Sequence, residues 1–272
     1  MEEIVHIVPL GWESDRAVLP IRRLLGHRVY LLCHPASDPM RSHYLESVRN
    51  RLERSGVRVV HVDVDSNLDV AGMLSETSRI ILKERVLGNR VLINIASAGK
   101  VAAVAVSIAA MAHLAPSEGR LYYPVAKSYS RGSDERKKHG IAVGMDGDPR
   151  WIPMFRIPLL PQPCGLILGH LASAPGHVLG FQDMIEKLRQ VGVNGFVSRG
   201  GVEAGIRAER NRRNSAFNKK VVQRLVSQGL AEVSKEGRDR SLKLTEAGIH
   251  YASLSGPASE RTAYEPLSSR TS

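Results

Sequence analysis

Residues 91–113 read VLINIASAGKVAAVAVSIAAMAH, and this stretch decides the fold. An apolar run of strand length, 91–95, leads into a Ser-Ala-Gly-Lys turn and then into alanine and aliphatic residues typical of a packed helix. The amide groups at such a helix start attract an anion, Gly99 permits close backbone approach, and Lys100 adds a full charge. The residues alone leave two interpretations open, an anion site and an ordinary helix start.

Strand-like and helix-like segments alternate along the chain before this stretch. Strand-like runs occupy 4–9, 29–33 and 57–64, and segments with helical spacing occupy 15–25, 42–55 and 70–87. This alternation predicts right-handed crossovers and an α/β fold, a Rossmann-like and mainly parallel sheet with helices on both faces. Beyond it we expect a fifth strand at 121–125 and an antiparallel addition formed by short strands at 141–143 and 151–157.

Three prolines, Pro158, Pro161 and Pro163, indicate a domain boundary. We therefore expect a first domain at 1–157, a linker at 158–163 and a second domain at 164–255. The Ser-, Thr- and Pro-rich segment 256–272 is expected to be a disordered tail.

Composition limits the classes of function. The 272 residues are 43% hydrophobic, and Lys and Arg outnumber Asp and Glu by 38 to 27, which favours a polyanionic partner. The longest uncharged apolar stretch, 101–114, is 14 residues long, whereas a membrane span needs about 20. With two cysteines and an acidic N-terminus that lacks signal-peptide features, the sequence favours a cytoplasmic protein without a membrane segment.

The C-terminal third has the layout of a winged helix-turn-helix. Short helices are expected at 166–171 and 181–191. A stronger helix is expected at 215–228, with an apolar stripe of Phe217, Val221, Val222, Leu225 and Val226. Gly229 ends that helix, and strands at 230–234 and 241–244 flank the basic turn KEGRDR. A last helix at 245–254 begins with Thr245 as its cap.

The basic residues of this third predict contacts to double-stranded DNA. Ten basic and four acidic side chains lie between 205 and 240. Helix residues supply hydrogen-bond donors for the major groove, and cations of the wing contact phosphates. The candidate DNA-binding residues are Arg212 and Arg213 just before the helix, Lys219, Lys220, Gln223 and Arg224 on it, and Lys235, Arg238 and Arg240 on the wing. The alternative is a solvated charged face on a winged helix that binds protein.

The loops that follow the first four strands are where a parallel sheet binds ligands. Neither G-x-G-x-x-G after the first strand nor a P-loop pattern is present, so ordinary dinucleotide binding and P-loop hydrolysis lack their signatures. Histidine and cysteine spacings match no zinc site, and Asp63, Asp65 and Asp69 are expected to be solvated loop carboxylates. We therefore expect neither a metal nor a resident cofactor.

Four segments carry a resemblance to a known family. "IVHIVPLGWESDR", "INIASAGKVAAVAVSIAAMA" and "LYYPVAKSY", followed by the wing-like "GLAEVSKEGRDRSLKLTEAGIHY", resemble the CARF (CRISPR-associated Rossmann fold) domains that precede a winged helix in archaeal transcription regulators. The resemblance implies a homodimer whose two CARF domains share a ligand site, commonly for cyclic oligoadenylate. The positions that it assigns to the ligand are Gly11, Trp12, Glu13, Arg16, Asn94, Ser97, Ala98, Gly99 and Lys100.

Three functions follow as hypotheses. The first is a dimeric, CRISPR-linked transcription regulator that binds DNA and senses a cyclic oligoadenylate or related nucleotide. The second is a ring nuclease that cleaves the cyclic oligoadenylate in the CARF dimer, with Ser97 and Lys100 beside the cleaved bond. The third is a CARF-like dimer without a nucleotide ligand.

Overall fold

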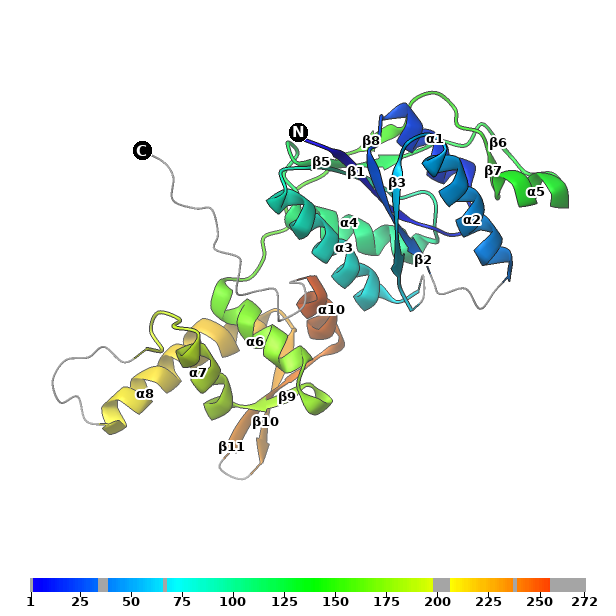
Figure 1. Ribbon diagram of the computed structural model, residues 1–272. Coiled ribbons are helices and arrows are strands. Elements are labelled where there is room, and N and C mark those ends of the chain that lie inside the picture. Colours follow the sequence, from blue (N-terminus) through cyan, green and yellow to red (C-terminus); the bar gives the residue numbers. More distant parts are fainter. Residues whose placement is uncertain (1, 34–38, 66–67, 198–205, 237–238, 255–272) are drawn as a thin grey trace. The chain divides into compact units, whose positions relative to one another are not determined.

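The computed structural model describes residues 2–33, 39–65, 68–197, 206–236 and 239–254. The chain divides into two compact units, unit 1 at 1–158 and unit 2 at 159–272 (Figure 1). The predicted linker 158–163 overlaps the first helix of unit 2, because α6 already begins at Gln162.

Unit 1 is built on a mainly parallel six-stranded sheet with the order β3-β2-β1-β4-β5-β8. Five strands are parallel, and β8 runs antiparallel to β5. The sheet confirms the predicted Rossmann-like fold. In sheet order its strands are β3 (Arg58–Asp63), β2 (Arg28–Cys33), β1 (Ile4–Pro9), β4 (Arg90–Asn94), β5 (Gly119–Tyr123) and β8 (Arg150–Ile152).

Helices cover both faces of this sheet. α1 (Asp15–Arg23) and α2 (Pro39–Glu53) lie on one face, and α3 (Val70–Val86) and α4 (Lys100–His113) lie on the other (Figure 1). The inner positions of α4 are small, with Ala102, Ala105 and Ala109 fully buried, so this helix packs closely against its neighbours. The strands β1 and β4 are almost entirely buried, as a two-sided parallel sheet requires.

Residues 124–149, which we name the excursion, leave the sheet after β5 and return before β8. They contain β6 (Ser128–Tyr129), α5 (Ser133–His139) and β7 (Ala142–Val143). The expectation that 141–143 joins an antiparallel addition to the main sheet is wrong, because β7 pairs with β6 in a separate two-stranded sheet. The loop after β1 holds β7 in this place, since the Ile141 amide donates to the Trp12 carbonyl at 2.9 Å.

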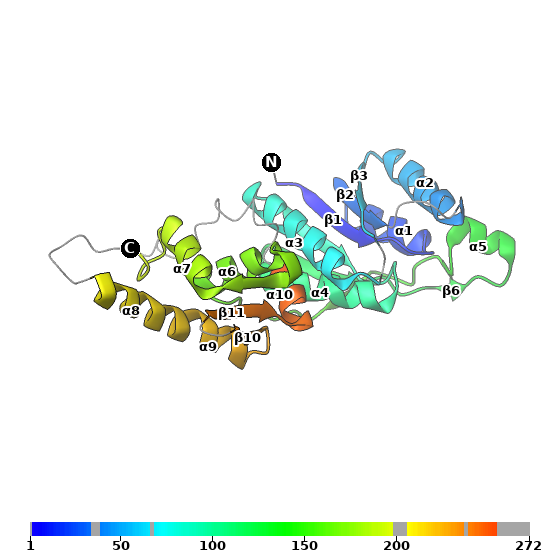
Figure 2. The ribbon, with the colours of Figure 1, turned by 90° about the horizontal axis from the view of Figure 1, so that it is seen from below.

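The described residues of unit 2 form four helices and a three-stranded antiparallel sheet of order β10-β11-β9. A long helix consists of α8 (Ile206–Phe217), the π turn η2 (Asn218–Val222) and α9 (Gln223–Ser227), and Figure 2 shows it as one continuous rod. The other elements, in chain order, are α6 (Gln162–Ala172), the 3-10 turn η1 (Pro175–His177), β9 (Val178–Gly180), α7 (Phe181–Gln190), β10 (Ala231–Glu236), β11 (Asp239–Leu244) and α10 (Glu246–Leu254).

Local sequence signals explain how these elements end. Gly229 has a φ of +67°, and the Leu230 amide donates to the Leu225 carbonyl at 2.9 Å, as in a glycine-terminated helix. Thr245 Oγ1 accepts from the Gly248 amide at 3.0 Å, which confirms the predicted cap. The long helix begins well before the predicted Ser215, and Val226, expected in the apolar stripe, is 42% exposed.

Candidate ligand site and nucleic-acid interface

The loops predicted to bind a ligand lie at the switch point of the sheet. β1 and β4 are neighbours, but the chain passes from β1 to α1 on one face and from β4 to α4 on the other. The two loops therefore flank the crevice in which open α/β sheets bind ligands. They also touch, because the Gly11 amide donates to the Ser97 carbonyl at 2.7 Å. A Cβ at Gly11 would lie 3.1 Å from that carbonyl oxygen, so the close approach favours glycine.

The Asn94 side chain forms hydrogen bonds to backbone groups of both segments that flank the crevice. This side chain is fully buried, Nδ2 donates to the Arg16 carbonyl at 2.8 Å, and Oδ1 accepts from the Ala96 amide at 2.9 Å. Behind it lies the fully buried Tyr122, whose hydroxyl is 2.9 Å from His6 Nδ1. Asn94 thus fixes the backbone of both loops rather than presenting its own amide to solvent.

Glu13 and Arg16 also face inward. Glu13 Oε2 accepts from the Ala142 amide at 3.0 Å, and Arg16 Nε donates to the Pro124 carbonyl at 3.0 Å. Burial raises the pKa of Glu13, while the Ala142 amide and the Arg16 charge act in the opposite direction. The Arg16 guanidinium lies 4.7 Å from the centre of the Tyr123 ring. Both side chains therefore attach the β1 loop to the excursion and to the end of β5.

Solvent reaches a smaller set of the predicted ligand residues. Gly99 and Lys100 are exposed, whereas Gly11, Trp12 and Ala98 are half-buried. Gly99 caps α4 without a side-chain hydrogen bond, so the amides of the first turn point out of the helix toward the crevice. An anion at this place meets amide donors and the Lys100 ammonium together.

Ser97 and the Trp12 ring both pack within unit 1. Ser97 is fully buried, and its Oγ has no hydrogen-bond partner among the described residues. The Trp12 ring stands edge-on to the Tyr44 ring at a centroid distance of 5.6 Å. The tryptophan therefore packs on α2 of its own unit, and Ser97 Oγ does not reach solvent as a nucleophile must.

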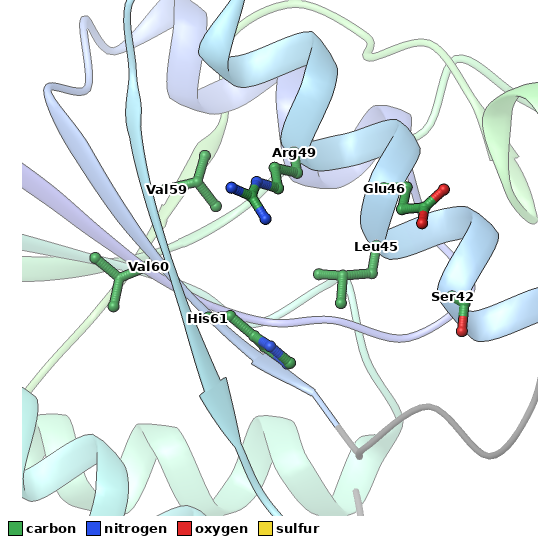
Figure 3. A pocket seen from close by; sticks show the side chains of 7 residues that line it. All are labelled: Ser42, Leu45, Glu46, Arg49, Val59, Val60 and His61. Atoms are coloured by element: carbon green, nitrogen blue, oxygen red, sulfur yellow. The ribbon is translucent and has the colours of Figure 1, made fainter.

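A pocket that the sequence did not predict lies between α2 and the edge strand β3. It has a volume of about 570 Å³, and Figure 3 shows Leu45 and Arg49 extending from α2 toward β3. Arg49 Nε donates to Glu53 at 2.8 Å. The pocket is lined by side chains from both elements, namely Ser42, Leu45, Glu46, Arg49, Val59, Val60 and His61. A sequence signal for it is lacking, because its shape comes from the pairing of a helix with an edge strand.

The predicted DNA-binding residues of the long helix of unit 2 come together. Lys219, Lys220, Gln223 and Arg224 line one hollow of about 590 Å³ with Ser227, and all five are exposed. This arrangement gives the outer face of the helix three cations and an amide, the groups that contact phosphates and base edges. Arg212 is exposed farther back on α8, whereas Arg213 forms an ion pair with Glu209 of the same helix.

The predicted wing residues lie on the hairpin. Lys235 and Arg240 are exposed and face each other in the register of β10 and β11. The Arg240 guanidinium lies 4.7 Å from the centre of the Phe181 ring of α7, a contact that the sequence did not predict. Arg238 lies outside the described residues.

Among the described residues, no three His, Cys, Asp or Glu side chains gather as a metal site. No helix there has both the length and the apolar character that crossing a membrane requires. Asp69, one of the candidate loop carboxylates, caps α3 by accepting from the Gly72 amide at 3.0 Å.

Fold and site together define a class, a Rossmann-like α/β domain joined to a C-terminal winged helix domain. Residues 4–129 match the family model described as HFX_2341_N-like, N-terminal. Residues 165–256 match the DUF6293 C-terminal winged helix domain. The chain thus pairs an HFX_2341_N-like domain with a DUF6293-type winged helix, which is consistent with the CARF and winged-helix arrangement that its sequence resembles. No curated protein matches the chain.

Solved structures give weaker matches. Protein VC1899 from Vibrio cholerae is 11% identical with a TM-score of 0.38, and the match covers 92% of this chain and 64% of that protein. Can2 from Sulfobacillus thermosulfidooxidans, in complex with cyclic tetra-adenylate, is 11% identical with a TM-score of 0.37. The match covers 92% of this chain and 63% of Can2. Enterococcus italicus Csm6, bound to cyclic hexa-2'-fluoro-hexa-dAMP, is 12% identical with a TM-score of 0.37. The match covers 47% of this chain and 34% of Csm6. The chain therefore spans less than two thirds of each of these proteins, and similarity at this level assigns no function.

Proposed function

We propose that this protein is a dimeric transcription regulator that binds double-stranded DNA through unit 2 and responds to a cyclic oligoadenylate or related nucleotide bound by unit 1. The observation that carries the proposal is the hollow on the long helix of the winged helix domain, where Lys219, Lys220, Gln223 and Arg224 face solvent together. A cationic helix face beside a wing with two exposed cations matches the needs of major-groove entry with phosphate contacts on either side.

The nucleotide half of the proposal is supported by the switch-point crevice. The first-turn amides of α4 and the exposed Lys100 suit a phosphate, and the β1 loop lies against the same crevice. A cyclic oligoadenylate carries several phosphates in a symmetric ring. Two copies of the Lys100 loop related by a two-fold axis match such a ring.

The outer face of α4 supports dimer formation. Val104 is 59% exposed, and Val101 and Ile108 near it are half-buried, so this face is apolar where a surface helix is usually polar. The same helix begins with Lys100. A dimer formed through α4 therefore brings two ligand loops toward one another.

DNA binding is tested with the full chain by fluorescence anisotropy on labelled duplexes over a series of salt concentrations. Each phosphate contact contributes a slope of about 0.9 to the dependence of log affinity on log salt. We expect Lys220→Ala and Arg224→Ala each to weaken binding and to lower this slope. Lys127→Ala removes an exposed cation from unit 1 and is the matched control. Equal affinity of all three variants and the wild type would refute the DNA-binding role.

Nucleotide binding is tested by thermal unfolding with cyclic tetra- and hexa-adenylate. A ligand at a hundred times its dissociation constant stabilises the folded protein by about 2.7 kcal/mol. We expect stabilisation by at least one ring and its loss in Lys100→Ala. A protein that no ring stabilises is the ligand-free dimer of the third hypothesis. Linear products after incubation with either ring would instead support the ring nuclease.

A further inference from the structure

The long helix of the winged helix domain contains a π turn beside its DNA-facing residues. At η2 (Asn218–Val222) the Gln223 amide donates to the Asn218 carbonyl, five residues back instead of four. This wider turn accommodates two consecutive buried valines, Val221 and Val222, on the core side. The exposed Lys219 and Lys220 come from the π turn itself, and Gln223 and Arg224 follow at the start of α9. Single π turns inside helices are frequently found at functional sites.

The π turn has a cost in backbone hydrogen bonds. Where the ladder returns from the five-residue spacing of Gln223 to four-residue spacing, the Lys219 carbonyl is skipped. A turn with one ladder bond fewer is held less firmly by its own helix, so contacts from outside the helix contribute more to its geometry.

A thiol from another helix contacts the π turn next to the skipped carbonyl. Cys164 in the first turn of α6 is fully buried, and its Sγ lies 3.3 Å from the Lys220 carbonyl oxygen. Sulfur is a donor only when it carries its proton. Burial raises the pKa of Cys164, which keeps the thiol protonated at neutral pH although the Arg224 charge opposes this.

We propose that Cys164 is a positioning residue for DNA recognition, whose thiol holds the π turn and thereby sets the direction of Lys219, Lys220, Gln223 and Arg224. The inference rests on the proposed DNA-binding function. Cys164 lies on α6, whereas the DNA-facing residues lie on the long helix. A buried cysteine on one helix would thus influence which bases the other helix contacts. Loss of the thiol allows η2 to relax toward regular α-helix and rotates the residues on one side of it relative to the other.

The test compares Cys164→Ala, which removes the donor, with Cys164→Ser, which keeps an O–H donor. Both are made in the full chain, and the probes are a duplex selected by the wild type from a random library and an unselected random duplex. We expect Cys164→Ala to bind the random duplex nearly as the wild type does and to lose about tenfold in preference for the selected one. Cys164→Ser should recover much of that preference. The control is Cys33→Ala, because Cys33 is the other buried thiol and donates to the Leu31 carbonyl in unit 1.

Two outcomes would overturn the inference. One is equal weakening of both duplexes with a fall in melting temperature, which indicates a purely structural cysteine. The other is an unchanged preference in Cys164→Ala. Amide hydrogen exchange gives a readout independent of DNA, since the amides of 222–225 should exchange faster in Cys164→Ala than in the wild type. If the wild type binds no duplex, the proposed function fails, and the exchange experiment still decides whether Cys164 holds the π turn.

Discussion

Replacement of Asn94 by alanine should uncouple the two loops of the switch-point crevice. The wild-type side chain is fully buried and satisfies the Arg16 carbonyl and the Ala96 amide at 2.8 and 2.9 Å. Asn94→Ala leaves both backbone groups buried without a partner, and each such group costs roughly 1–3 kcal/mol. Some relaxation of the loops will reduce this cost. We therefore expect unit 1 to lose about 2–4 kcal/mol of unfolding free energy.

Urea unfolding followed by tryptophan fluorescence measures this loss. The chain has two tryptophans, and both Trp12 and Trp151 lie in unit 1, so the signal reports that unit. Asn50→Ala is the control, because Asn50 is exposed on α2 and alanine is favourable in a helix. A loss below about 0.5 kcal/mol in Asn94→Ala would refute the view that this amide holds the loops together.

Three further predictions concern other parts of the molecule. Burial lowers the pKa of His6 from 6.5 to about 3. Below pH 6.5 the unfolded chain therefore binds a proton at this histidine that the folded chain does not bind. The free energy of unfolding should fall as the pH drops from 6.5 toward 3, by up to about 1.4 kcal/mol per pH unit. His6→Gln should flatten this dependence in urea titrations at several pH values, and an unchanged slope would contradict the assignment. Gly248→Ala places a Cβ 1.9 Å from the Leu230 carbonyl oxygen and should destabilise unit 2 by about 1–3 kcal/mol in calorimetry. Gly165→Ala, where a Cβ meets nothing within 4 Å, should have little effect or stabilise the unit. Val104→Asp should shift sedimentation toward the monomer, whereas Leu25→Asp, at a residue that is 75% exposed, should leave it unchanged; equal behaviour of the two would argue against a dimer through α4.

The alternation of strands and helices was enough to predict the sheet of unit 1. Buried parallel strands such as 91–95 are continuous apolar runs, and that property is visible in the sequence itself. The cap at Thr245 and the glycine end at Gly229 were equally predictable, because each depends on residues within five positions of it.

The start of the long helix of unit 2 was missed for a physical reason. Residues 206–217 read IRAERNRRNSAF, where basic and polar side chains form no apolar stripe up to Phe217. Helix formation there depends on packing against α7 and on ion pairs such as Arg213–Glu209, which the spacing of apolar residues does not reveal. The π turn also has no sequence signature, since its contact from outside the helix comes from Cys164, more than fifty residues away.

The two loops predicted to bind a ligand lie at the switch point, but the direction of their side chains was not predictable from the sequence. The sequence places Glu13 and Arg16 beside Trp12, which favours a set of side chains that all contact one ligand. Their partners at Pro124 and Ala142 are more than a hundred residues away, and only the fold brings them near. Which of the predicted positions contact a ligand stays a prediction.

The excursion has an electrostatic consequence for the crevice. The β1 loop carries two carboxylates, and free carboxylates at this place would repel any phosphate. The excursion supplies hydrogen-bond partners for both carboxylates. The amides of Ala142 and Gly144 donate to Glu13 and Asp15 at 3.0 and 2.9 Å. His139 Nδ1 lies 2.8 Å from Asp15 Oδ2. Residues 124–149 thus supply hydrogen-bond donors that partly offset the charge of both carboxylates, and an anion at the mouth of the crevice meets Lys100 and the amide dipoles of α4.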